Sequence, residues 1–284
     1  MAIDDEKVLK LMEGATDAHI HSFPSHFERY ADDYQLLKEA DEYKMAGIVI
    51  KNHYEPTSSR CLLLNNMGLT KAKAYGGIVL NNSVGGLNPD AVESSARLGA
   101  RIVWMPTADS LNVYIFDGVW DAFTKGERIT VLGEDGKLKP EVHEIIDIAK
   151  NYGMTVATGH ISPKESFEVC KAARAKNVKT VLTHPEYPAT RIDAAGQKEF
   201  ADMGVYIEKL WYNVGNGIVT AEYMADTIKQ VGAANCHMAT DRGQKSKESP
   251  VRGMQLFIKA MLENGISEDD VYLMIHENAE RVVR

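Results

Sequence analysis

The 284-residue sequence has few of the features that mark secreted, membrane-spanning or disulfide-stabilised proteins. It contains only three cysteines, Cys61, Cys170 and Cys236, which are widely spaced and odd in number, so no disulfide framework is expected. No uninterrupted apolar run approaches the length needed to cross a bilayer. The acidic start, MAIDDEKVLK, lacks the apolar core of a signal peptide. These absences favour a cytoplasmic protein.

The sequence also has no excess of basic residues. The 32 Lys and Arg residues are outnumbered by 40 Asp and Glu residues, which gives a net charge of −8. Nucleic acids and anionic membranes are bound through basic faces, so we expect neither as the main partner and predict a small-molecule substrate instead. A hydrophobic content of 44% allows a sizeable core. Residues 1–284 are expected to form a single domain, and a homo-oligomer remains open.

Short apolar, β-branched runs alternate with longer segments of helical periodicity along the whole chain. Eight runs are predicted to be strands, at residues 15–21, 46–53, 74–81, 100–107, 153–160, 179–184, 204–210 and 235–241. The predicted helices are residues 33–45, 59–72, 90–98, 140–151, 163–176, 191–203, 221–231 and 248–263, with a short helix at 268–275. At Ser162-Pro163-Lys164-Glu165, an N-cap serine, a first-turn proline and a capping-box glutamate predict where one helix begins.

This alternation predicts an α/β fold, the (β/α)8 TIM barrel, whose usual length matches the chain. An open doubly wound sheet is the alternative, but no Gly-x-Gly-x-x-Gly segment follows an early strand. Residues 109–139 form an insertion after strand four, with a hairpin expected at residues 128–138. The aromatic content of the insertion predicts an ordered cover over the site. Its aromatic residues are Tyr114, Phe116, Trp120 and Phe123.

Histidines gather at the predicted carboxyl ends of strands, where barrel enzymes carry their catalytic residues. His19 and His21, in the segment DAHIHS, are two residues apart and would project from the same face of strand one. His53, His160 and His184 end strands two, five and six, and Asp241 ends strand eight. Imidazole and carboxylate groups together are typical ligands of zinc, manganese, nickel or iron. We therefore expect a site for a divalent transition metal, most readily zinc or manganese.

Four segments in this order resemble the amidohydrolase superfamily: DAHIH at strand one, ATGH at strand five, LTH at strand six and ATD at strand eight. The terminal HENAERVV is similar to the final helix of that family. Among its subgroups, the sequence is nearest to phosphotriesterase-like, TatD-like and small uncharacterised amidohydrolase-like proteins. The resemblance implies metal-assisted hydrolysis. His19, His21 and Asp241 would hold one ion, and His160 and His184 a second.

In this scheme Asp241 would also accept the proton of the attacking water, because a metal ion can lower the pKa of bound water from ~15.7 to around 7. The sequence departs from the family at strand four, where binuclear members often supply a carboxylated lysine or a glutamate that bridges the ions. Strand four here ends Trp-Met-Pro-Thr. Lys51 on strand two is the nearest substitute if it is carboxylated, and a substrate-anion contact or a salt bridge is its equal alternative. Glu208 is a weaker candidate bridge. One or two ions per chain therefore remain open.

His53, Arg242 and Glu208 are expected either to contact the substrate or to support the ligands, and Arg242 would bind a substrate carboxylate or pair with an acid at the rim. The leading function is a metal-dependent hydrolase acting on a small cyclic amide, lactone, ester or related carbonyl compound. The alternative is a mononuclear-metal lyase, a decarboxylase or hydratase, in which a free His184 acts as acid or base. A non-catalytic ligand-binding barrel is the third. The absence of a Gly-x-Ser-x-Gly elbow argues against a serine hydrolase.

Overall fold

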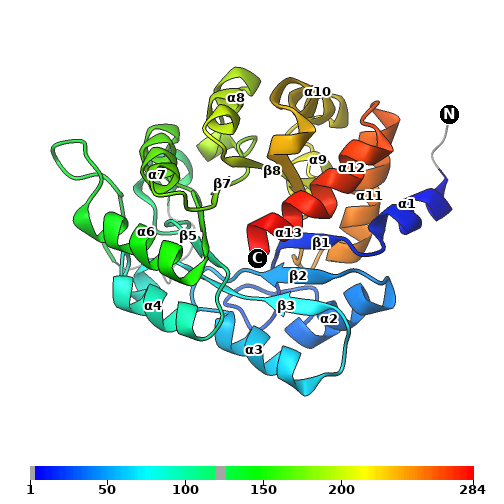
Figure 1. The fold of residues 1–284 in the computed structure, drawn as a ribbon, viewed down its shortest axis with the longest axis horizontal. Coiled ribbons are helices and arrows are strands. Elements are labelled where there is room, and N and C mark those ends of the chain that lie inside the picture. The colour runs from blue at the N-terminus through cyan, green and yellow to red at the C-terminus, as the bar shows by residue number, and fades with distance from the viewer. Residues whose placement is uncertain (1–3, 119–125) are drawn as a thin grey trace.

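The computed structural model describes residues 4–118 and 126–284, which form the expected (β/α)8 barrel (Figure 1). Every strand pairs in parallel with its neighbour, in the orders β1-β2-β3 and β4-β5-β6-β7-β8-β9. The strands are β1 (Thr16–Ile20), β2 (Gly47–Ile50), β3 (Lys73–Tyr75), β4 (Gly77–Val79), β5 (Ile102–Trp104), β6 (Thr155–Ala157), β7 (Thr180–Leu182), β8 (Tyr206–Leu210) and β9 (Cys236–Ala239).

The structure has two short strands, β3 and β4, where the sequence predicts one strand at residues 74–81. The division falls at Gly76, where a Cβ atom would lie only 2.6 Å from the backbone of Ser58, so this close approach requires glycine. At the opposite edge, the chain after β9 returns to β1, and the His21 amide donates a hydrogen bond of 2.7 Å to the Arg242 carbonyl. The first and last strands are therefore joined by backbone hydrogen bonds.

Helices cover the outside of the strands (Figure 1). All the predicted helices occur, and α1, α5 and α9, of 8, 7 and 5 residues, are short additions. In the described ranges no helix is both long and apolar enough to cross a membrane. The helices are α1 (Asp5–Met12), α2 (Asp33–Glu42), α3 (Ser58–Met67), α4 (Pro89–Arg97), α5 (Leu111–Asp117), α6 (Pro140–Tyr152), α7 (Pro163–Ala175), α8 (Ala194–Asp202), α9 (Trp211–Gly215), α10 (Ala221–Val231), α11 (Pro250–Glu263), α12 (Glu268–Ile275) and α13 (Glu277–Val283).

Local sequence signals fix several of these boundaries. The Ser162 hydroxyl accepts a hydrogen bond from the Glu165 amide, and the Glu165 carboxylate accepts one from the Ser162 amide, which is the predicted capping box at the start of α7. The hairpin expected at residues 128–138 is also confirmed, by an antiparallel bridge between Leu132 and Leu138. These elements therefore follow from short-range chemistry.

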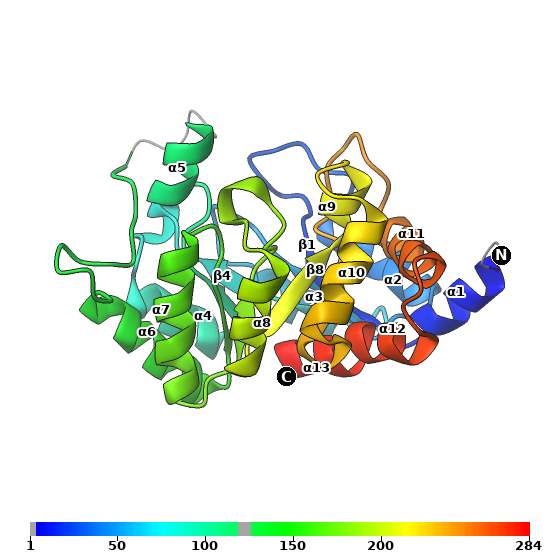
Figure 2. The ribbon, with the colours of Figure 1, turned by 90° about the horizontal axis from the view of Figure 1, so that it is seen from above.

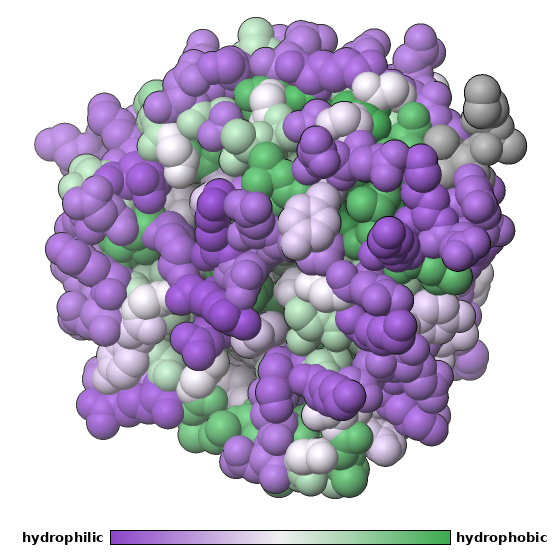
Figure 3. Space-filling view, turned by 45° about the vertical axis from the view of Figure 1, so that its right-hand side comes forward, coloured by the Kyte–Doolittle hydropathy of each residue, from purple (hydrophilic) through white to green (hydrophobic). Residues whose placement is uncertain are grey.

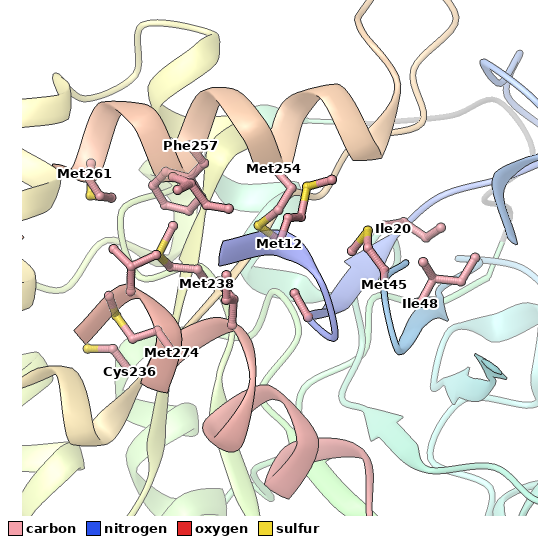
Figure 4. Packing of buried hydrophobic residues seen from close by; sticks show 14 of the residues in the cluster. Met12, Ile20, Met45, Ile48, Cys236, Met238, Met254, Phe257, Met261 and Met274 are labelled. Carbon is pink, nitrogen blue, oxygen red and sulfur yellow. The ribbon is translucent and has the colours of Figure 1, made fainter. Parts of the chain in front are cut away.

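The core lies both outside and inside the ring of strands. Outside, α11, α12 and α1 pack on the barrel through a methionine-rich cluster, and the flexible thioether side chains fill the irregular space between helices (Figure 4). Inside, small and apolar strand residues surround the buried Trp104. The C-terminal helix α13 joins this inner cluster through Val282 and Val283. On the face shown in Figure 3, apolar side chains are scattered among polar ones.

The barrel has one end closed by packing and one end bearing the loops that carry the histidines. The Thr155 hydroxyl, at the start of β6, donates a hydrogen bond of 2.6 Å to the Val282 carbonyl of α13. Figure 2 shows α13 and α12 on the lower side of the molecule, and α5 and α9, which follow the carboxyl ends of β5 and β8, on the upper side. The functional end is therefore the upper one in that view.

The described part of the insertion after strand four carries two of the four aromatic residues that were predicted to cover the site. Its helix α5 leaves the side chains of Tyr114 and Phe116 44% and 57% exposed. Neither side chain is among those that line the cavity at this end of the barrel, and the cover itself stays a prediction. Trp120 and Phe123 lie outside the described residues. The helix instead supports neighbouring loops, since the Asn112 side chain donates to the carbonyls of residues 160 and 189.

Candidate metal centre

A cavity of about 260 Å³ opens at the carboxyl ends of the strands. Its volume suits a small molecule, and its lining combines aromatic rings with a few ionisable groups, as ligand pockets commonly do. The segments that follow β1, β2, β6, β7, β8 and β9 supply all the lining residues. These are His21, Phe27, Arg29, Lys51, His53, His160, His184, Tyr187, Tyr212, Asp241 and Gln244.

His19, His21 and Asp241 converge beside this cavity, which His21 and Asp241 line. The Asp241 Oδ1 atom lies 3.0 Å from His21 Nε2 and 3.4 Å from His19 Nε2. One donor atom from each residue lies within 4.8 Å of the others, and this is the only such group of three or more His, Cys, Asp or Glu residues found in the described ranges. The backbone holds the group together, because the Asp241 amide donates to the His19 carbonyl at 2.8 Å. The arrangement is that of a three-ligand metal site.

Glu208 orients the first of these histidines from beneath. Its Oε1 atom lies 3.1 Å from His19 Nδ1, so the carboxylate fixes a hydrogen on Nδ1 and leaves the lone pair of Nε2 facing Asp241. His19 Nε2 is buried and makes no hydrogen bond within the described part of the chain. A buried nitrogen lone pair beside a carboxylate oxygen would be satisfied by a cation. The residues present therefore fit a divalent transition metal.

The carboxylates at this centre are held in the ionised form. Burial opposes ionisation of Asp241, but the neighbouring His19 and His21 outweigh burial and hold the pKa of Asp241 far below its usual value. Burial likewise opposes ionisation of Glu208, and His19 and His237 together hold its pKa well below the usual range. Both groups therefore carry negative charge at neutral pH, as ligation and its support require.

A second group of imidazoles lies next to the first, with ring centres 5.0 Å apart for His21 and His53 and 6.4 Å apart for His19 and His184. The ring centres of His160 and His184 are 4.7 Å apart, and His53 lies 5.9 Å from His160. The chain reaches His160 through Gly159, whose φ is +60° and whose Cβ, if present, would lie 2.2 Å from the Met105 carbonyl oxygen. Burial lowers the pKa of His184 to about 4, so its imidazole is neutral at pH 7. These rings offer neutral nitrogen atoms toward the same space.

Lys51 is the buried cation of the cavity floor. Its side chain is about 1% exposed, and its Nζ lies 5.5 Å from the centre of the Trp104 ring. Burial lowers the pKa of Lys51, an effect that the nearby Asp241 and Glu208 partly oppose. No carboxylate of the described ranges lies within salt-bridge distance of its Nζ, and its role, as a bridge or as a contact for an anion, stays a prediction.

Arg242 directly follows Asp241 in the sequence. It does not line the cavity, because its buried guanidinium turns outward and its Nε donates to Glu248 Oε1 at 2.8 Å. The aromatic side chains of Trp211 and Tyr212 flank it at 5.9 Å. Arg242 therefore pairs with an acid, which is the second of the two roles expected for it. Glu208 also lies outside the cavity lining, where it supports His19 instead of facing a second ion.

Several cavity residues were not predicted. Tyr187, Tyr212 and Gln244 each follow a strand by a few residues, so their position at the functional end of a barrel is the signal that could have found them. His237, which lies in β9 and not in the cavity lining, contacts Glu208 at 3.6 Å and was not predicted either. Arg29, in the long loop after β1, had no such signal.

Solved structures with the same fold come from the amidohydrolase superfamily. An amidohydrolase from Pseudomonas aeruginosa is 15% identical, with a TM-score of 0.68 over 99% of this chain and 98% of its own. A TatD homologue from Escherichia coli is 13% identical, with a TM-score of 0.59 over 96% and 98%. A 2,6-dihydroxybenzoate decarboxylase from Rhizobium is 12% identical, with a TM-score of 0.54 over 96% and 99%.

These likenesses place the chain among barrels with the fold of the amidohydrolase superfamily, so the resemblance expected from the sequence is confirmed at the level of the fold. The model of the family described as "Family of unknown function (DUF6282)" matches residues 14–208, and the chain belongs to this family. No curated protein matches the chain in sequence.

Proposed function

We propose that this protein is a metal-dependent hydrolase that acts on a small cyclic amide, lactone, ester or related carbonyl compound. The observation that carries the proposal is the convergence of His19, His21 and Asp241 beside a small-molecule cavity that two of them line. Neutral imidazoles and one carboxylate suit zinc or manganese, one or two ions per chain, and leave a bound dication strongly Lewis acidic. The protein would work on its substrate in the cytoplasm, without nucleic acid or a membrane as partner.

The residues of the chain have distinct roles in this proposal. His19 and His21 would hold the metal, and Glu208 would keep the His19 ring in the orientation that presents Nε2. A dication at this place would polarise the substrate carbonyl and acidify a water molecule. Asp241, ionised and beside both imidazoles, would accept the proton of the attacking water and return it to the leaving group.

A lyase is the second candidate, and one observation favours it. Outside the three-residue cluster, His184 is held by Thr190, whose hydroxyl lies 3.2 Å from the His184 Nδ1 atom. An oriented, neutral imidazole in the cavity is suited to act as an acid or base on substrate bound to a single ion. The shared fold with a decarboxylase agrees with this alternative.

The test combines metal analysis with turnover. Purified protein should contain a transition metal, and removal of that metal with a chelator should abolish hydrolysis of one member of a panel of lactones, esters and cyclic amides. Zinc or manganese should restore it. His21→Ala should lose both metal and activity, whereas His143→Ala, an exposed histidine on α6, should keep both. Full activity of metal-free protein would refute the proposal, and release of carbon dioxide from aromatic carboxylates without hydrolysis would favour the lyase.

A further inference from the structure

The loop after β1 brings one arginine to the mouth of the cavity. The backbone of Arg29 forms an antiparallel bridge with Gln244, and the Tyr30 amide donates a hydrogen bond of 2.8 Å to the Gly243 carbonyl. This loop is therefore fixed to the loop that follows Asp241. Arg29 and Gln244 both line the cavity, so the bridge places the arginine over the same space that the metal cluster faces.

Arg29 differs from three other arginines with little exposed surface, each of which has a carboxylate within 4 Å. Arg60 contacts Asp33 at 2.8 Å, Arg242 contacts Glu248 at 2.8 Å, and Arg128 lies 3.8 Å from Asp109. In the described ranges, the polar contact of the Arg29 side chain is an Nε hydrogen bond of 3.2 Å to the Ser25 hydroxyl, and no carboxylate lies within 4 Å of it.

The Arg29 guanidinium also lies 5.5 Å from the centre of the Phe27 ring, which holds it without neutralising it. Burial lowers the pKa of Arg29 to about 10, so the side chain stays positively charged at neutral pH. Its terminal N–H groups can still bind an anion.

The cavity has little negative charge to balance Arg29. Asp241 is the one carboxylate among the side chains that line it, and it also belongs to the metal cluster. A bound dication would add further positive charge. Cations that are partly removed from water attract an anion strongly, because the effective dielectric constant in such a place is well below that of bulk water. The charge imbalance thus calls for an anionic group on the substrate.

We propose that Arg29 is a specificity-determining residue that binds a carboxylate of the substrate, so that the natural substrate is a small hydrolysable carbonyl compound carrying a carboxylate. This inference rests on the proposed hydrolase function and names its substrate class. The planar N–H fork of arginine matches a carboxylate in two parallel hydrogen bonds. Phosphate sites more often use backbone amides at a helix N-terminus or a glycine-rich loop, whereas the lining here consists of side chains.

The first experiment compares substrate pairs. The metal-loaded protein is assayed with carboxylate-bearing lactones or esters and with the same compounds in which the carboxylate is a primary amide. The wild type should prefer the carboxylate, and Arg29→Gln should lower kcat/KM for it by about 10- to 100-fold, the range typical of a hydrogen bond to a charged group. Arg29→Lys should recover part of this loss. Lys245→Gln, which removes an exposed cation paired with Glu28 nearby, should change kcat/KM by less than about 2-fold.

The second experiment measures binding without turnover. Calorimetry with succinate, succinamide and inorganic phosphate should show that succinate binds most tightly and that Arg29→Gln weakens its binding by about 10-fold or more. Metal content and circular dichroism check that the variant is folded and loaded. If hydrolysis occurs but the wild type does not distinguish carboxylate from amide, the Arg29 inference fails and the hydrolase stands.

If no panel member is hydrolysed but succinate binding depends on Arg29, the hydrolase proposal fails and the carboxylate site stands. Tighter, Arg29-dependent binding of phosphate than of succinate would overturn the carboxylate assignment.

Discussion

On one side of the cavity His19 and His21 meet a carboxylate, whereas on the other side His160 and His184 meet each other. Asp241 lies within hydrogen-bonding distance of His21, and Glu208 fixes the His19 ring from below. Around His160 and His184, no comparable group of three converging His, Cys, Asp or Glu donors is found in the described ranges. The first side can hold an ion with the residues it has.

The second side needs an added anion if it is to hold an ion as well. Two dications a few ångströms apart repel each other unless a negative group lies between them. The candidate for that group is Lys51, which becomes an anion only when carboxylated. The side chains of the chain can therefore hold one metal ion without modification. A second ion would require carboxylation of Lys51.

The largest effect is expected from a substitution of Asp241, which distinguishes a role in the chemical step from a role in substrate binding. Asp241→Asn should lower kcat by about 100-fold or more with a smaller change in KM, because the amide cannot accept the proton of the attacking water. Steady-state kinetics on the metal-loaded variant measure this. Asp90→Asn, at the exposed start of α4, is the control and should behave as wild type. A near wild-type kcat in Asp241→Asn would remove the residue from the mechanism.

Glu208 tests whether the support beneath the first side matters. Glu208→Gln should weaken metal affinity by about 10- to 100-fold, because a neutral amide no longer strengthens the His19 ligand. Competition with a metal-binding dye measures the affinity. Glu186→Gln is the matched control, since this buried carboxylate pairs with Lys209 on the outer face of the strands and does not contact the cluster. Unchanged metal affinity in Glu208→Gln would show that the His19 contact is only structural.

Much of this asymmetry was predictable from sequence, because parallel strands converge at their carboxyl ends. The positions of His19, His160 and His184 relative to apolar runs were enough to place them in one region. Loop conformation was not predictable by the same reasoning. Arg242 directly follows Asp241 but turns outward to Glu248, while Arg29 turns inward from a loop with no periodic pattern. The periodicity of the strands does not predict the direction of a side chain in the loops that follow them.

Lys51 decides how many ions the two sides hold together. We predict two ions bridged by carboxylated Lys51, so Lys51→Met should lose about one metal per chain, and bicarbonate should help reconstitution of the wild type. The lowered pKa of Lys51 favours the neutral amine that carbon dioxide requires. Elemental analysis gives the stoichiometry, and Lys179→Met, at the other end of the barrel, is the control. One ion in both wild type and Lys51→Met would exclude the bridge and strengthen the lyase alternative.

The smallest expected effect concerns the pH dependence of stability on the second side, measured on metal-free protein. Burial lowers the pKa of His184 to about 4, below the value near 6.5 that the unfolded chain would have. As the pH falls from about 6.5 to about 4, the unfolded state binds a proton that the folded state does not. Acidification through this window therefore favours unfolding, by about 1.4 kcal/mol per pH unit for one such group.

His184→Gln removes the imidazole that binds this proton in the unfolded state. The free energy of unfolding of the variant should therefore fall less steeply with acid than that of the wild type. Urea denaturation at several pH values between 7 and 4.5 measures the slope. His143→Gln, which replaces an exposed histidine on α6, should leave the slope unchanged.

Burial also lowers the pKa of His21, to about 3, so a similar flattening is expected for His21→Gln on the first side. Adding zinc should raise the free energy of unfolding of the wild type without flattening its slope, because a metal-bound imidazole takes up no proton either. A fall with acid that is as steep in His184→Gln as in the wild type would contradict the assignment.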